Sequence, residues 1–184
     1  MLGALRIAAW CAAGAFAVAQ TYPGVLDDKP VDPFAGKAKA LVFVFVRTDC
    51  PISNRYAPEL NRLYREFTDR GVAFWMVYPD ASETREAIVR QLEEYRLPGR
   101  ALRDPSHALA RRANVTIAPE AAVFSSDGRL VYHGRIDNRY VEVGKAMPSP
   151  TRRDLEEAIA AVVAGRAPAE ASAPAVGCFL ADVK

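Results

Sequence analysis

One cysteine stands just after an uninterrupted apolar run and directly before a proline. Residues 41–46, LVFVFV, are aliphatic, β-branched and aromatic, which is typical of a strand buried on both faces of a sheet. Cys50 and Pro51 follow within a few residues, and the apolar positions after them recur at helical spacing. Proline suits the first position of a helix, where no backbone N–H is needed. The pattern therefore predicts a strand that delivers Cys50 to the first turn of a helix.

The predicted position of Cys50 favours thiol chemistry. A helix N-terminus carries partial positive charge and unpaired N–H groups, so it stabilises a thiolate and lowers the pKa of a cysteine from its ordinary value of about 8.5. Arg47 and Arg55 lie close enough in the sequence to add positive potential, although Asp49 opposes them. We therefore interpret Cys50 as a reactive nucleophile.

Two further prolines complete a family pattern. Pro58 comes eight residues after Cys50, and Pro119 lies in the later segment VTIAPEAAVF, before an Asp-Gly hairpin cue. In this order the motifs resemble the thioredoxin-like redoxin family, which groups secreted thiol oxidoreductases of the TlpA type with the AhpC/TSA peroxiredoxins. The resemblance implies an α/β thioredoxin fold, with a central mixed β-sheet flanked by helices on both faces. It also implies that Pro119 is a cis-proline facing Cys50, and that the backbone of Ala118 pairs with an extended thiol substrate.

The chain departs from both branches of this family. A dithiol thioredoxin has a second cysteine three residues after the first, whereas this chain has Ser53 there. A peroxiredoxin has a threonine three residues before its cysteine; here Thr48 stands two before Cys50, and Phe43 occupies the position of an upstream proline. Pro51 and Ser53 are still the motif residues expected to line a substrate site. A partner for Cys50 must come from elsewhere in the chain.

The N-terminal residues 1–19 have the pattern of an export signal. Arg6 is the only charge, an apolar stretch follows it, and small residues at positions 17 and 19 suit a signal peptidase. Cleavage near Ala19 would remove Cys11 and yield a periplasmic or extracellular protein. Residues 20–37 are then predicted to be an N-terminal arm.

The redoxin-like domain is predicted over residues 38–165, and the C-terminal tail over residues 166–184. The tail is rich in alanine and proline, and it is long enough to carry Cys178 back across a small domain. In an oxidising compartment we expect the two remaining cysteines to pair, at least transiently. Gly177 would allow close backbone approach, and residues 179–180, Phe-Leu, would dock on an apolar groove. Cys178 is thus either a resolving thiol or one end of a static disulfide clip.

Three functions fit these residues. The first, which we favour, is an exported thiol–disulfide oxidoreductase: Cys50 attacks the disulfide of a partner protein, Cys178 resolves the mixed disulfide, and an external thiol supplies electrons. The second is a peroxidase: a peroxide oxidises Cys50 to a sulfenic acid that condenses with Cys178, and Thr48 and Arg135 stand in for the usual threonine and arginine. The third is a copper-binding module of the Sco type, using Cys50 and His133.

Composition narrows the range of partners. The formal net charge is +2, and the chain has no basic block or aromatic-interleaved patch, so we expect no nucleic-acid partner. After the N-terminal signal no apolar run is long enough to span a membrane. The favoured function needs no cofactor and no metal, because the thiols themselves carry the electrons.

Overall fold

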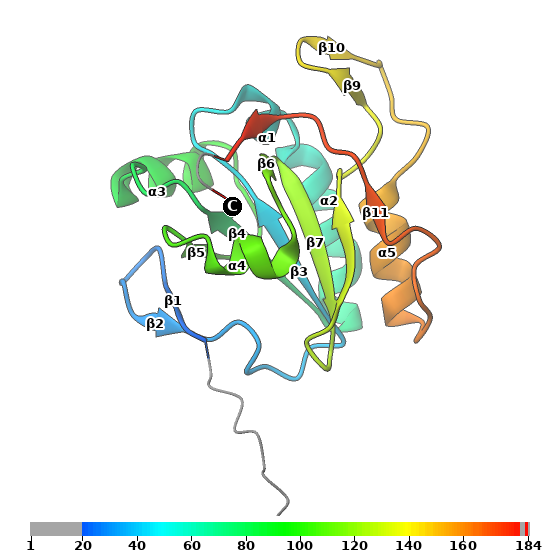
Figure 1. Ribbon diagram of the computed structural model, residues 1–184, viewed down its shortest axis with the longest axis horizontal. Helices are drawn as coiled ribbons and strands as arrows, with labels where there is room; N and C mark the ends of the chain where they lie inside the picture. Colours follow the sequence, from blue (N-terminus) through cyan, green and yellow to red (C-terminus); the bar gives the residue numbers. More distant parts are fainter. Residues whose placement is uncertain (1–19, 181–182, 184) are drawn as a thin grey trace, which may run out of the picture.

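A six-stranded mixed sheet forms the centre of the structure, a computed structural model that describes residues 20–180 and 183 (Figure 1). The strand order is β11-β8-β7-β3-β4-β5. Its strands are β3 (Ala40–Phe45), β4 (Val72–Tyr78), β5 (Arg100–Arg103), β7 (Glu120–Ser125), β8 (Leu130–Gly134) and β11 (Ser172–Ala173). β3, β4 and β5 are parallel, whereas β7 is antiparallel to both of its neighbours, β3 and β8. The export signal predicted at residues 1–19 lies outside the described residues.

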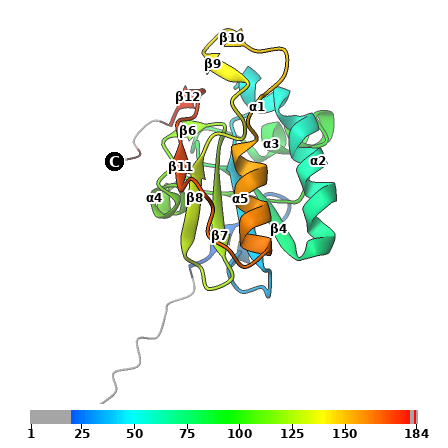
Figure 2. The same ribbon diagram turned by 90° about the vertical axis from the view of Figure 1, so that its right-hand side faces the viewer.

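Helices cover both faces of this sheet, which confirms the predicted fold class (Figure 2). The helices are α1 (Pro51–Arg55), α2 (Ala57–Phe67), the short 3₁₀ helix η1 (Thr68–Arg70), α3 (Arg85–Glu94), α4 (Ala108–Ala113) and α5 (Asp154–Val163). Leu60 of α2, Ile88 of α3 and Ile159 of α5 are buried in one cluster on one face. Leu109 of α4 is buried in a second cluster on the opposite face. None of the helices in the described part of the chain is long and apolar enough to cross a membrane.

β3 is the most enclosed strand of the sheet. All six of its residues are buried, as its uninterrupted apolar run predicts. Val42 and Val44 belong to the cluster beneath α2, α3 and α5, whereas Phe43 and Phe45 belong to the cluster beneath α4. This alternation places β3 between the two cores. Its carboxyl end, where the chain turns toward α1, is therefore held from both sides.

The N-terminal arm packs against the domain instead of standing apart from it. Strands β1 (Tyr22–Pro23) and β2 (Pro30–Val31) form a hairpin. The Tyr22 side chain is buried in the α4-side core, and Phe34 adds an aromatic ring to it. The Phe34 ring centroid lies 5.4 Å from that of Phe43 and 5.3 Å from that of Phe124. The arm thus completes the face of the sheet that the single helix α4 leaves partly uncovered.

After α5, the C-terminal tail runs along the β8 edge of the sheet and then turns toward the end of the molecule that carries α1 (Figure 1). β11 first pairs with β8 at the sheet edge, and β12 (Cys178–Phe179) then pairs with β6 (Ile117–Ala118). At the first of these contacts, a Cβ on Gly134 would lie 2.1 Å from the carbonyl oxygen of Ala173, so a glycine is needed there. The 137–150 segment forms the hairpin of β9 (Tyr140–Glu142) and β10 (Lys145–Ala146), at the same end of the molecule (Figures 1 and 2).

Replacing Phe34 with alanine is expected to lower the free energy of unfolding by about 2 kcal/mol, because the half-buried ring packs against two core aromatic rings. Urea unfolding followed by tryptophan fluorescence measures the change. Leu26→Ala in the same arm is the control: Leu26 is 67% exposed, so its truncation should change stability by less than about 0.5 kcal/mol. Equal stability of the Phe34→Ala variant and the unchanged chain would mean that the arm does not stabilise the core.

Candidate active site

Cys50 lies where the sequence pattern predicts, at the junction between β3 and α1. It is the N-cap residue of α1, and Pro51 occupies the start of that helix with its ring exposed to solvent. The backbone N–H of Asn54 donates to the Cys50 carbonyl at 3.3 Å, which closes the first helical turn. The Cys50 side chain is fully buried. The predicted strand–cysteine–helix junction is therefore confirmed.

The predicted cis-proline also lies beside this cysteine. The Ala118–Pro119 peptide bond is cis. The carbonyl oxygen of Ala118 is 3.4 Å from the Cys50 sulfur, within reach of its thiol proton. Pro119 separates β6 from β7, and β7 pairs directly with β3. The sheet itself therefore brings the Ala118 backbone to the cysteine.

The second thiol comes from the C-terminal tail. β12 pairs antiparallel with β6, with Cys178 opposite Ala118 and Phe179 opposite Ile117. Both thiols are free, and their sulfur atoms are 3.1 Å apart. A disulfide bond is about 2.05 Å long, so closure needs a further approach of only about 1 Å.

One expectation about the tail is wrong. The sequence predicts that Phe179 and Leu180 both dock on an apolar groove, but Phe179 is 77% exposed and only Leu180 is buried. The reason is the strand geometry of the tail, because successive side chains of a strand point to opposite sides. Cys178 and Leu180 share the inward side, and Phe179 points outward.

The two thiols differ in acidity. Burial raises the pKa of Cys50, but hydrogen bonds from the Cys178 thiol and from the backbone and hydroxyl of Ser53 outweigh it, so the pKa of Cys50 lies below its ordinary value. Burial raises the pKa of Cys178 to about 11, together with the hydrogen bond to Cys50 and the negative charge of the ionised Cys50. Cys50 is therefore the more acidic thiol of the pair, and the Cys178 thiol donates a hydrogen bond to its sulfur. Ser53, which stands where a dithiol motif has cysteine, serves this thiolate as a donor.

The other polar side chains expected near the sulfur are engaged elsewhere. The Arg47 guanidinium donates to both carboxylate oxygens of Asp49, at 3.0 and 2.9 Å, and lies 3.3 Å from Asp80. The Thr48 backbone N–H donates to the Glu83 carboxylate at 2.5 Å. Arg47 and Thr48 thus hold the loop that precedes Cys50, and the positive charge of Arg47 also lowers the pKa of Cys178.

Two other arginines of the sequence predictions, Arg55 and Arg135, lie in solvent and in an ion pair, respectively. Arg55 ends α1 and is exposed to solvent. Arg135 forms two hydrogen bonds with the buried carboxylate of Asp154, at 2.8 and 3.1 Å. The negative partner neutralises the Arg135 charge within the fold. The expectation that Arg135 serves a peroxide is therefore not supported by its contacts.

Sequence reasoning missed Gln91, which clamps the loop before Cys50. Its amide nitrogen donates to the Arg47 carbonyl at 2.9 Å and to the Asn54 side chain at 2.6 Å. Its amide oxygen accepts from the Tyr78 hydroxyl at 2.8 Å. Gln91 is buried in α3, where helical spacing alone gives no sign of this role. Gln91 thus joins β4, the loop before Cys50 and α1.

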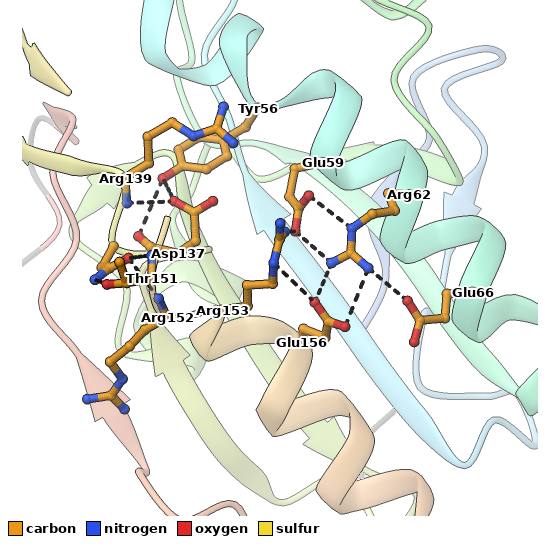
Figure 3. Close-up of polar contacts among 11 residues, drawn as sticks. Tyr56, Glu59, Arg62, Glu66, Asp137, Arg139, Thr151, Arg152, Arg153 and Glu156 are labelled. Atoms are coloured by element: carbon orange, nitrogen blue, oxygen red, sulfur yellow. Dashed lines mark hydrogen bonds and ion pairs between the residues drawn. The ribbon is translucent and has the colours of Figure 1, made fainter. Parts of the chain in front are cut away.

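A second polar cluster fixes the hairpin segment against the helix that follows Cys50 (Figure 3). The Tyr56 hydroxyl donates to Asp137 at 2.7 Å, and the Arg139 backbone N–H donates to the same carboxylate oxygen at 2.8 Å. Burial and the Asp137 contact raise the pKa of Tyr56, so the phenol stays protonated as a donor. A network of Glu59, Arg62, Glu66, Arg153 and Glu156 next to this cluster joins α2 to α5 (Figure 3). These contacts hold α2, the helix directly after α1, against α5 and the hairpin segment.

Metal ligands do not gather at the two cysteines in the described part of the chain. Within residues 20–180 and 183, no group of three or more His, Cys, Asp or Glu side chains could hold a metal ion. The His133 ring lies against Glu120, with the closest approach 3.4 Å, and within 3.5 Å of the Asn114 amide. The copper hypothesis therefore receives no support from the surroundings of His133.

A low-pKa cysteine at a helix start, opposite a cis-proline in a thioredoxin-like fold, defines the protein as a thiol-based oxidoreductase. Residues 16–133 match the model of the AhpC/TSA family, and the chain belongs to this family. No curated protein matches the chain.

Solved structures agree with the fold. An uncharacterized conserved protein from Geobacillus kaustophilus is 24% identical, with a TM-score of 0.75 over 88% of both chains. A hypothetical protein from Sinorhizobium meliloti is 23% identical, with a TM-score of 0.73 over 87% of this chain and 88% of that chain. A secreted Mycobacterium tuberculosis disulfide oxidoreductase homologous to E. coli DsbE is 20% identical, with a TM-score of 0.54 over 80% of this chain and 96% of its own. These similarities show a thioredoxin-like fold.

Replacing Cys178 with alanine is expected to raise the pKa of Cys50, because the thiolate loses a hydrogen-bond donor while it stays in a buried site. The pH dependence of the thiolate ultraviolet absorbance, in a Cys11→Ser background, measures the shift. Cys178→Ser is the matched control: a hydroxyl still donates, so its Cys50 pKa should stay closer to that of the unchanged chain. The same Cys50 pKa in all three proteins would contradict a role for Cys178 in stabilising the thiolate.

Proposed function

We propose that this protein is a thiol–disulfide oxidoreductase that uses Cys50 as the nucleophile and Cys178 as the resolving cysteine. The observation that carries the proposal is the 3.1 Å separation of the two free sulfur atoms, one with a lowered and one with a raised pKa. The substrate class is a disulfide of a partner protein. The export pattern of residues 1–19 fits this class, because disulfides persist outside the reducing cytosol.

The proposed cycle balances two electrons. The Cys50 thiolate attacks one sulfur of the partner disulfide, so that a mixed disulfide forms and the first partner thiolate leaves. Cys178 then loses its proton to that leaving thiolate or to water, and its sulfur attacks the Cys50 sulfur. The Cys50–Cys178 disulfide forms and the second partner thiolate leaves. The partner is reduced by two electrons, the enzyme pair is oxidised by two, and an external dithiol reductant restores the pair.

Disulfide exchange fits the site better than peroxide reduction. A peroxide needs donors aimed at the oxygen atoms beside the reacting sulfur. Of the two residues that could supply them, Arg135 has its guanidinium bound to the Asp154 carboxylate, and Thr48 is held through its backbone N–H by the Glu83 carboxylate. An attack on a disulfide needs an available thiolate and a second thiol, and Cys50 and Cys178 meet both needs.

The test is stopped-flow reaction of the reduced protein with a small model disulfide, with thiols counted before and after. A Cys11→Ser background removes the third cysteine. We expect the loss of two thiols in this background, a trapped mixed disulfide on Cys50 when Cys178→Ser is added, and reaction only at the uncatalysed rate when Cys50→Ser is added.

The same proteins are also mixed with hydrogen peroxide. Rapid peroxide consumption, with a sulfenic acid trapped on Cys50 in the Cys178→Ser protein, would make the protein a peroxidase and overturn the proposal. Inertness toward both the disulfide and the peroxide would leave the two cysteines as a static clip.

A further inference from the structure

The C-terminal tail occupies the place that the partner disulfide needs. With β12 paired to β6, the Cys50 side chain is fully buried and the tail cysteine touches its sulfur. Another disulfide can reach Cys50 only when β12 leaves the edge of β6. A partner segment that replaces β12 meets the same backbone and the same side-chain sites. The tail therefore displays the contacts that an extended peptide makes at this edge.

Two contacts of Leu180 and the exposure of Phe179 define what this edge accepts. The Leu180 backbone N–H donates to the Thr116 carbonyl at 2.9 Å, which extends the β12–β6 pairing by one residue. The Leu180 side chain is only 8% exposed and packs into the α4-side core. Phe179, between Cys178 and Leu180, is exposed, so its position accepts any side chain.

The residue before the tail cysteine is restricted by sterics. A Cβ on Gly177 would lie 2.2 Å from the Ala118 carbonyl oxygen and 2.9 Å from the Ile117 side chain. The first of these neighbours is backbone, and it also contacts the Cys50 sulfur at 3.4 Å, so it cannot withdraw without disturbing the site. Any peptide that follows the path of the tail therefore needs glycine at this position.

We propose that the β6 edge is a recognition site for an extended cysteine-bearing segment of a partner protein, with glycine immediately before the cysteine and a large aliphatic residue two positions after it. Residues 177–180 occupy this site as an internal competitor in the dithiol form. The proposal rests on the proposed function, because it names the substrate class of the same thiol. Main-chain pairing supplies affinity at such an edge, and the side-chain pocket supplies selectivity.

The docked segment of the tail is small, so a partner peptide can compete with it for the β6 edge. β12 has two paired residues, and Leu180 is its buried apolar anchor. A segment with so few contacts opens locally at a small free-energy cost, while the tether returns it at high effective concentration. A partner with matching residues gains the contacts that the tail gives up. A partner without these residues forms only the mixed disulfide with Cys50.

The test uses four peptides, each carrying its cysteine as a mixed disulfide with a chromogenic thiol. The parent peptide has the sequence of residues 175–180, AVGCFL, and the others replace its glycine, its phenylalanine or its leucine with alanine. The protein is the full chain with Cys11→Ser and Cys178→Ser, so that Cys50 is its only thiol. Release of the chromogenic thiol gives the rate constant. The parent and the phenylalanine-substituted peptide should react within about 2-fold of each other, and the other two about 10-fold more slowly.

Adding Leu180→Ala to the protein tests the internal competitor. The weakened tail should let a small model disulfide reach Cys50 several-fold faster, whereas Val143→Ala, a truncation at a 73% exposed site of the hairpin, should not change this rate. Equal rates for all four peptides, or a rate unchanged by Leu180→Ala, would overturn the recognition proposal while leaving disulfide exchange intact. Failure of Cys50 to react with the peptides and with the small disulfide alike would overturn the proposed function itself.

Discussion

The Ala118 carbonyl group is the point on which the arrangement of the site depends. Its oxygen lies 3.4 Å from the Cys50 sulfur, and Gly177 of the tail passes so close to it that no side chain fits between them. β6 presents this group to the tail, and β7, one residue beyond Pro119, pairs along the full length of β3. The strand that positions Cys50 therefore also positions the backbone that receives the tail. One carbonyl fixes both sulfur atoms relative to each other.

The unequal pKa values of the two thiols suit the order of the proposed steps. In the dithiol form, the hydrogen bond and the negative charge of Cys50 help to raise the pKa of Cys178, so Cys178 stays protonated and the attack falls to Cys50. Once Cys50 has formed a mixed disulfide, its sulfur carries no charge. Burial and the Asp49 carboxylate still oppose ionisation of Cys178, but the two contributions of Cys50 to its raised pKa are gone, so the Cys178 thiolate becomes easier to form. Cys178 is thus unreactive before the first step and more reactive after it. This order of reactivity does not require a second cysteine at the position of Ser53.

Local patterns in the sequence predicted the junction at Cys50, because an apolar run and a proline at a helix start act over neighbouring residues. The cis-proline was implied by the family resemblance and not by a local pattern. The meeting of Cys50 with Cys178 was predicted from the number of cysteines and the reach of the tail. The register of the tail was not, since pairing with β6 decides that Leu180 is buried and Phe179 exposed. Nor were the contacts of Thr48 with Glu83 and of Arg47 with Gln91, because these partners are 35 and 44 residues apart in the chain. Spacing within one motif carries no information about such partners.

The β6 edge has its own support, so it keeps its shape when the tail leaves. The buried Glu120 carboxylate accepts hydrogen bonds from the backbone N–H groups of Thr116 and Ile117, at 3.1 and 3.3 Å. These bonds lie within the chain segment around Pro119 and do not involve β12. A binding edge that is already ordered spares an incoming peptide the conformational entropy cost of ordering it. Exchange of the tail for a partner segment can then be confined to residues 177–180, while the sheet, the helix at Cys50 and the cis-proline stay fixed.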